Sequence, residues 1–364
     1  MKIFFFFPED LTRLGGTPFR IIKLAQTLGV YGYDVYVLAT GIDQKDIKHF
    51  TFLKLKNTSF TRYFLSSELA FLLKKIQPDL LYSFCGVSLF PARISKKFHI
   101  PLIAEIHSLD PYSFLEKHNL PESIGVLLHP FMRFLVRPAS HLIVVTPALQ
   151  KFYQPKPSTL MIMGTDLTPP SKKDHSIRLP PKKNKIIAMY SGNFRKCQGV
   201  DLLFHTIQKL NKSNDTSFLF AFMGCTQNEF DTYTKRYATG DLCVYLGKPP
   251  LHTTSAYLSY ADIFICPRIS SKTNLYTSAS KLIDYLAIRK PIICTHTGDP
   301  FHLLKGNGIY IHENPDELIH ALHTISRHHS SYTISAQKYT LSSLTIQANL
   351  LQLHSLFKQI LSPS

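Results

Sequence analysis

Acidic residues, long apolar runs and paired cysteines are all scarce in this sequence. Its 364 residues include 24 Asp and Glu against 41 Lys and Arg, a formal net charge of +17. No apolar stretch reaches the roughly 18 residues that a membrane-spanning helix needs. None of the six cysteines forms a C-x-x-C pair. We therefore expect no spanning helix, zinc site or disulfide framework, and we expect the cysteines to be buried free thiols.

The positive charge is spread over both halves of the chain, with no basic tail or arm of the kind that binds DNA. Such an excess favours an anionic partner: nucleic acid, an acidic membrane or a phosphorylated substrate. With 45% apolar and 18% charged residues, the composition is that of a globular protein. The length favours two domains.

Apolar strand-like runs alternate with helical patterns along the whole chain. In the first half such runs cover residues 2–7, 33–38, 80–84, 100–106 and 141–145. In the second half they cover residues 186–190, 218–223, 243–246, 263–266 and 291–295. Runs that are apolar on both faces and separated by helices are typical of a parallel sheet covered on each side.

A proline-rich stretch, residues 151–185, separates the two halves. It is expected to connect the domains and to hold neither a helix nor a central strand. The sequence thus predicts an α/β protein with two doubly wound domains, residues 1–165 and 166–335. An amphipathic closing helix within residues 340–364 is expected to pack back on the first domain.

A glycine pair, Gly15 and Gly16, lies between the first strand and the first helix. Glycines there let backbone N–H groups approach an anion at the helix N terminus. A tight turn explains them equally well. The spacing is not G-x-G-x-x-G, so the nicotinamide-binding fingerprint is absent.

The second half opens in the same way, with a loop bounded by Gly192 and Gly199. The loop carries Arg195 and Lys196, and it lies where ligands bind in α/β sheets. We interpret it as a pyrophosphate cradle. In the alternative interpretation the cations are solvated and Gly199 serves only as a turn.

Another motif joins Arg268 at a strand end, a polar loop over residues 269–278, and a helix that begins at Ser280. Lys281 in the first helical turn is unfavourable unless an anion lies there. Asp284, one turn later, is placed to accept hydrogen bonds from sugar hydroxyls. The alternative is a Lys281–Asp284 surface pair.

Two further features have competing interpretations. His107 follows a buried strand at the carboxyl edge of the first sheet, where it is either a site residue or a structural hydrogen-bonding group. Residues 124–136 are apolar with interspersed His129 and Arg133. Packing into the core is the commoner role for such a segment, and an amphipathic surface entering an anionic leaflet is the alternative.

The order of these motifs resembles glycosyltransferase family 4, whose members are retaining enzymes of the GT-B fold. Further matching pieces are Gly32-Tyr33-Asp34-Val35, Gln77-Pro78-Asp79-Leu80, Gln198-Gly199-Val200-Asp201 and Tyr260-Ala261-Asp262-Ile263. The resemblance covers most of the chain. It implies two Rossmann-like domains facing a central cleft.

The resemblance also implies an activity: transfer of a hexosyl group from a nucleotide-diphosphate-sugar, with retention and without a metal or resident cofactor. The catalytic residues it implies are His107, Lys281 and Arg268. The donor-binding residues it implies are Gly15, Gly16, Gly192, Asn193, Arg195, Lys196, Gln198, Ser278 and Asp284.

This sequence departs from the family pattern at three places. Asn193 and Gln198 stand where the family has Arg and Lys, and Tyr276 falls near the first Glu of its paired-Glu motif. Some bacterial branches are similar to this variant. In such a branch Arg268 and Lys281 would supply the missing positive charge.

The expected partners are a nucleotide-sugar donor and a glycan, lipid-linked or lipopolysaccharide-type acceptor, with no nucleic acid. We expect a cytoplasmic protein, with peripheral placement on an anionic membrane face left open. Three alternatives remain: a UDP-sugar epimerase on the same fold, a non-catalytic sugar-nucleotide-binding relative, and a nucleic-acid binder suggested by charge alone.

Overall fold

A computed structural model shows two compact units. The first comprises Met1–Gly164, Tyr276–Ser278 and Ser343–Ser364, and the second comprises Thr165–Leu275 and Ala279–Ser342. The structure describes residues 1–11, 16–41, 48–55, 66–84, 89–170, 179–182, 184–250, 253–297, 303–304, 308–332 and 344–361.

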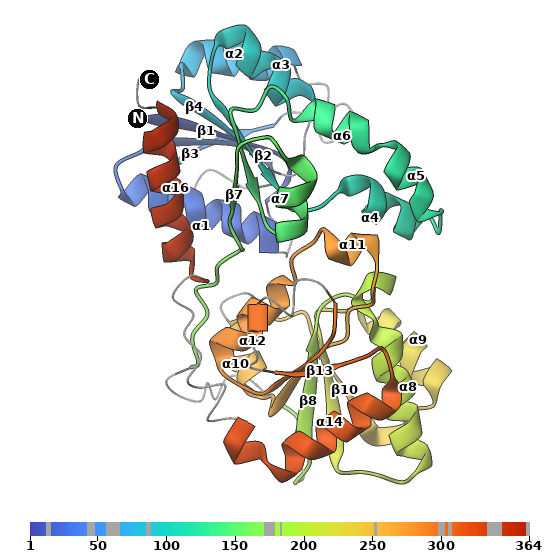
Figure 1. Ribbon diagram of the computed structural model, residues 1–364. Coiled ribbons are helices and arrows are strands. Elements are labelled where there is room, and N and C mark those ends of the chain that lie inside the picture. Colours follow the sequence, from blue (N-terminus) through green and yellow to red (C-terminus); the bar gives the residue numbers. More distant parts are fainter. Residues whose placement is uncertain are drawn as a thin grey trace. The chain divides into compact units, whose positions relative to one another are not determined.

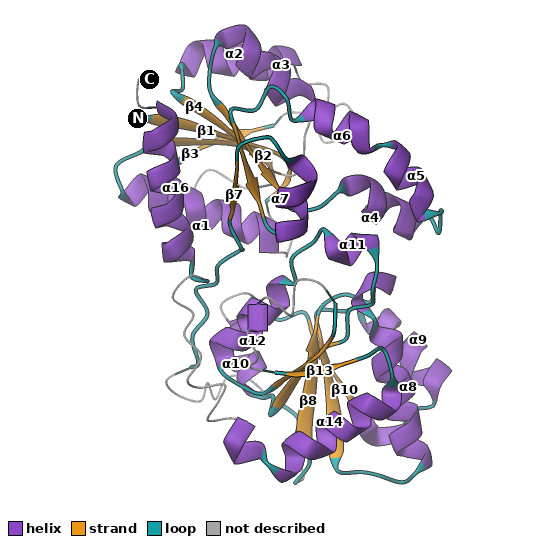
Figure 2. Cartoon of the chain, in the orientation of Figure 1, coloured by secondary structure: helices purple, strands orange, loops and turns teal. Residues whose placement is uncertain are grey.

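A seven-stranded parallel sheet forms the centre of the first unit (Figures 1 and 2). From edge to edge its strands are β3 (Thr51–Lys54), β2 (Asp34–Thr40), β1 (Lys2–Asp10), β4 (Leu80–Phe84), β5 (Leu102–Ile106), β6 (His141–Val144) and β7 (Ser158–Leu160). The strand order reverses between β1 and β4. The carboxyl edge at such a reversal is where α/β proteins bind ligands.

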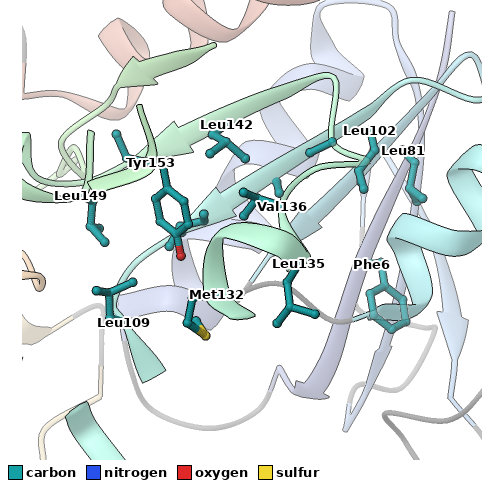
Figure 3. Close-up of a cluster of buried hydrophobic side chains, with 14 of the residues drawn as sticks. Phe6, Leu81, Leu102, Leu109, Met132, Leu135, Val136, Leu142, Leu149 and Tyr153 are labelled. Carbon is teal, nitrogen blue, oxygen red and sulfur yellow. The ribbon is translucent and has the colours of Figure 1, made fainter. Parts of the chain in front are cut away.

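Helices cover both faces of this sheet, because successive side chains of a strand point to opposite faces. Phe4 and Phe6 of β1 belong to the buried cluster of which Figure 3 shows one part, and Ile3, Phe5 and Phe7 belong to the cluster on the other face. The helices of this unit are α1 (Gly16–Val30), α2 (Ser66–Ile76), α3 (Leu89–Phe98), α4 (Asp110–Lys117), α5 (Glu122–Leu127), α6 (His129–Leu135), α7 (Pro147–Tyr153) and α16 (Ile346–Leu361).

The C-terminal helix α16 is part of the first unit although the second unit precedes it in the chain. Its Leu353 and Phe357 are fully buried beside residues of α1 and β1. The Phe357 ring lies edge-on to Tyr82 of β4, with centroids 6.2 Å apart. Burying two such side chains contributes roughly 3–6 kcal/mol, so this helix stabilises the first unit.

The second unit is built around a six-stranded parallel sheet (Figure 2). From edge to edge its strands are β10 (Cys243–Gly247), β9 (Phe218–Met223), β8 (Ile186–Ser191), β11 (Ile263–Cys266), β12 (Ile292–Thr295) and β13 (Ile309–Ile311). Its helices are α8 (Val200–Lys212), α9 (Gln227–Tyr237), α10 (Thr254–Ser259), α11 (Lys272–Leu275), α12 (Ser280–Ile288) and α14 (Pro315–Arg327). The strand order reverses between β8 and β11.

The prediction of two doubly wound parallel-sheet units is confirmed. The central cleft stays a prediction. Cys197, Cys225, Cys266 and Cys294 are buried free thiols as expected, Cys243 is half-buried, and Cys85 lies outside the described residues. None of the described helices is long and apolar enough to cross a bilayer.

Three local predictions are wrong. The stretch 151–185 is expected to hold no helix, but it begins with the last turn of α7. Its strand β7 pairs with β6 at the edge of the sheet, so the expectation of no central strand holds. The loop 269–278 contains the short helix α11. Much of 124–136 is not core: Leu127 is 79% exposed, because only Gly125, Met132, Leu135 and Val136 face the unit's interior.

Candidate functional site

The loop after β8 turns sharply at two glycines, both of which have a positive φ. Gly192 has φ +148° and Gly199 has φ +68°. A Cβ on Gly192 would lie 2.7 Å from the Nζ atom of Lys281, and a Cβ on Gly199 would lie 1.7 Å from the Pro267 carbonyl oxygen. Both positions therefore need glycine. Gly192 leaves room for the Lys281 side chain, and Gly199 lets the loop after β8 contact the loop after β11.

Lys281 reaches this loop from the first turn of α12. Its Nζ donates to Oε1 of Gln198 at 2.7 Å and lies 4.1 Å from the ring centroid of Tyr190. In the described part of the chain it forms no ion pair with a carboxylate. Burial lowers the pKa of Lys281 to about 8, with nearby Arg268 lowering it further. An anion at this point would restore the favourable electrostatics that burial removes.

The helix α12 begins beside Lys281 without a side-chain cap, because its N-cap residue is Ala279. The first N–H groups of a helix favour an anion through their partial positive charge. Lys281 and these amides together have the chemistry of a phosphate site.

Arg268 is buried at the end of β11, where it is only 3% exposed. Its Nε donates to Oδ1 of Asn274 at 2.8 Å, and Asn274 Nδ2 donates to the carbonyl oxygens of Cys197 and Ile269. This network ties the loop after β8 to the loop after β11. Arg268 thus holds the two loops in place, a role that the sequence did not indicate.

The remaining cations of the predicted cradle point outward. Asn193, Arg195 and Lys196 are exposed, whereas Gln198 is half-buried and holds Lys281. The structure therefore brings Gly192, Gln198 and Lys281 together in the second unit. Arg195 and Lys196 are available to solvent or to a bound ligand.

Asp284 lies on α12 one turn after Lys281 but does not pair with it. Its Oδ1 accepts a hydrogen bond from Thr165 Oγ1 at 2.9 Å. Burial raises the pKa of Asp284 to about 7, and the neighbouring Asp166 raises it further. The alternative of a solvated Lys281–Asp284 surface pair is wrong, because each side chain has a different partner.

His107 follows β5 in the first unit and is tied to a buried carboxylate. Its Nε2 lies 2.6 Å from Oε1 of Glu105, whose side chain is fully buried. Arg20 of α1 donates to the same oxygen at 2.8 Å, and the Tyr82 hydroxyl donates to Oε2. Burial would raise the pKa of Glu105, but Arg20, His107 and Tyr82 outweigh it and hold that pKa at about 2.

Glu105, Arg20 and Asn274 are buried polar residues whose roles the sequence does not predict. A charged residue within the otherwise apolar strand Leu102–Ile106 was the one available signal, since buried acids are rare unless paired. The partner of Glu105 is 85 residues away in the sequence, so only the fold reveals the pair.

The other predicted residues are placed as follows. Gly16 is the first residue of α1, and Gly15 lies outside the described residues. Ser278 has a buried Oγ with no hydrogen-bond partner among the described residues. Tyr276 stacks on Tyr112 with ring centroids 5.8 Å apart, so an aromatic contact occupies the place where the resemblance expects a Glu.

Replacing Gly199 by alanine is expected to destabilise the second unit by more than about 1 kcal/mol, because the new Cβ meets the Pro267 carbonyl at a positive φ. Urea unfolding measures the loss. Gly247→Ala is the matched control: φ is +73°, but the nearest atom is an ordinary 3.9 Å away. Equal losses in the two variants would show that the contact between the loops is not the cause.

Comparison with known proteins gives a family for each half of the chain. Residues 14–156 match the model described as Glycosyltransferase Family 4, and residues 185–328 match that described as Glycosyl transferases group 1. Together the two matches span most of the sequence. Each half of the chain is thus similar to a glycosyltransferase family, the first half to family 4 and the second half to group 1. The predicted resemblance is therefore confirmed. No curated protein matches the chain in sequence.

Solved structures show that this protein has the GT-B fold. It is similar to sucrose-phosphate synthase from Thermosynechococcus elongatus (TM-score 0.79, 14% identity, 100% of both chains). It is similar to HepE of Anabaena in complex with UDP-glucose (0.74, 14%, 99% of this chain and 100% of that one). It is also similar to WaaG, a glycosyltransferase involved in lipopolysaccharide biosynthesis (0.70, 15%, 96% and 99%).

Proposed function

We propose that this protein transfers a sugar from a nucleotide-diphosphate-sugar to a glycan, lipid-linked or lipopolysaccharide-type acceptor, with retention of configuration and without a metal ion. The observation that carries the proposal is the setting of the Lys281 ammonium group. It is a desolvated cation with no carboxylate partner in the described chain, and it lies at an uncapped helix N terminus beside Gly192. A diphosphate supplies the missing negative charge.

In this mechanism the second unit binds the donor. Lys281 and the first amides of α12 stabilise the charge that develops on the diphosphate as the sugar departs. Gln198 holds the Lys281 ammonium in position through its Oε1. Asp284 accepts hydrogen bonds from ribose hydroxyls, and Arg195 and Lys196 add outer contacts to the phosphates. No side chain needs to act as a nucleophile, so catalysis is positioning and charge stabilisation.

The fold neighbours support the choice of donor and acceptor classes. HepE was solved with UDP-glucose, and WaaG is named for lipopolysaccharide biosynthesis. No group of three or more His, Cys, Asp and Glu placed to hold a metal ion occurs among the described residues. In our proposal Lys281 and backbone amides stabilise the charge on the departing diphosphate.

A donor screen tests the function. UDP-, GDP- and ADP-sugars are compared by thermal shift, and the best ligand is then incubated with and without an acceptor panel. Product that forms only with an acceptor and keeps the donor's anomeric configuration supports the proposal. Conversion of the donor alone would identify an epimerase. Tight binding without turnover on any acceptor would identify a non-catalytic relative.

The first unit has an apolar face that we propose lies on an anionic membrane. The segments α4, α5 and α6 expose Phe114, Ile124, Val126, Leu127, Phe131 and Phe134. Arg137 and Lys156 meet at one end, where Lys156 Nζ donates to the Arg137 carbonyl oxygen. A second copy of a chain with net charge +17 would be repelled, whereas anionic lipid would be attracted.

Substituting Phe131 and Phe134 together by serine is expected to weaken binding to vesicles at least about tenfold, because two aromatic side chains that insert into the lipid are lost. Sedimentation with phosphatidylglycerol-containing vesicles measures it. Phe71→Ser on α2, also an exposed phenylalanine, is the control and leaves binding unchanged. Equal binding to uncharged phosphatidylcholine vesicles would contradict the electrostatic part. Concentration-dependent dimers without vesicle binding would assign the face to self-association.

A further inference from the structure

Glu105 is the only acidic side chain of the described residues with no exposed surface at all. It lies near the end of β5, in the interior of a parallel sheet. A buried ion pair is weak evidence for stability, since apolar residues of similar volume often serve as well. A fully buried carboxylate beside a predicted catalytic histidine therefore calls for another reason.

The carboxylate is held from three sides. Arg20 Nε and His107 Nε2 both lie within hydrogen-bond distance of Oε1, at 2.8 and 2.6 Å, and the Tyr82 hydroxyl donates to Oε2. Because the pKa of Glu105 is about 2, the group is an ionised acceptor at neutral pH. His107 must then be the donor in its contact with Glu105, so Nε2 carries a proton.

Arg20 is itself fixed by the C-terminal helix. Its Nη1 donates to Oδ1 of Asn349 on α16 at 2.6 Å, and Gly164 N–H donates to the same oxygen at 2.8 Å. Asn349 Nδ2 donates to the Ile162 carbonyl oxygen. Every member of this chain from α16 to β5 is thus oriented by a neighbour, which is how buried networks specify one geometry.

We infer that the Arg20–Glu105 pair is a positioning device for His107: it orients the imidazole and keeps a proton on Nε2, facing the Glu105 carboxylate. Glu105 and Arg20 are positioning residues that act through His107. The inference rests on the proposed sugar transfer and on the predicted role of His107 as a catalytic residue in it. The state of the imidazole itself does not depend on any activity.

The kinetic test uses a double-mutant cycle. Glu105→Gln keeps the shape and one acceptor oxygen for Arg20 and His107 but removes the charge, and we expect kcat to fall on the order of tenfold with donor KM unchanged. In a His107→Ala background the same substitution should have no further effect, because Glu105 acts only through that ring. Glu122→Gln on α5 is the matched control. An undiminished effect of Glu105→Gln without His107 would overturn the inference.

A second variant separates positioning from folding. Arg20→Met with Glu105→Leu replaces the pair by apolar residues of similar size, so we expect the melting temperature to be retained and transfer to fall at least tenfold. A well-folded double variant with full activity would overturn the inference. If the double variant does not fold, the cycle with Glu105→Gln still decides.

Ring-nitrogen NMR of 15N-labelled histidine decides the question without activity. The wild-type spectrum should show His107 protonated on Nε2, and the double variant should show exchange between tautomers. A wild-type ring without a proton on Nε2 would overturn the inference. If no sugar is transferred by the wild type while the Nε2–H signal is present, the proposed function fails and the positioning of His107 stands.

Discussion

Replacing Lys281 by alanine is expected to lower sugar transfer by on the order of 10²-fold, the size of effect seen when one charge-stabilising donor is removed. The reason is the setting of its ammonium group, which lies against Gln198 and Tyr190 with no carboxylate to neutralise it in the described chain. Steady-state kinetics with the donor found in the screen measures the change. Lys235→Ala on α9 removes an exposed charge from the same unit and is the control.

The same side chain predicts a pH dependence. Because burial lowers the pKa of Lys281 to about 8, the free enzyme loses this charge as the pH rises through that value. We expect kcat/KM for the donor to fall above about pH 8, since that ratio reports groups of the free enzyme. Lys281→Arg retains its charge and should remove this fall. Wild-type turnover in Lys281→Ala, or a flat profile to pH 10, would show that the phosphate site lies elsewhere.

Asp284→Asn is expected to raise donor KM roughly tenfold, because a neutral amide accepts hydrogen bonds from ribose hydroxyls less strongly than a carboxylate. Thr165 holds the carboxylate through Oδ1, a contact that asparagine can retain. Asp241→Asn, at an exposed position of the second unit, is the matched control. An unchanged donor KM would show that Asp284 does not contact the ribose.

Asp284→Asn also predicts a change in stability with a definite sign. In the folded chain burial raises the pKa of Asp284 from 3.8 to about 7, so the folded state holds this proton more tightly than the unfolded state does. The stabilisation from the protonated group is complete below about pH 4 and is lost as the pH rises through 7. The variant should therefore melt above the wild type at pH 8 and show no such advantage at pH 4. A lower melting temperature for Asp284→Asn at pH 8 would contradict the assignment of the raised pKa.

The architecture of each unit and the family resemblance follow from the sequence alone, because they depend on local periodicity and on motif order. Strands that are apolar on both faces predict a parallel sheet covered on each side. The order of the motifs along the chain, from Gly16 to Asp284, can be read without knowing which side chains are in contact. The helix that carries Lys281 was predicted with its first turn correctly placed. Its phosphate-binding role stays a prediction.

Which polar groups contact one another is visible only in the folded chain. Arg20 and Glu105 are 85 residues apart, and Asn349 joins them from a helix near the C terminus. The sequence does not show which residue Arg268 contacts. In the structure its hydrogen bond to Asn274 links the loop after β11 to the loop after β8. Residues 124–136 have a composition that suits both the core and the surface, and packing leaves most of them outside. Periodicity reports which face of an element is apolar, whereas the partner of a buried charge is set by packing between elements distant in the chain.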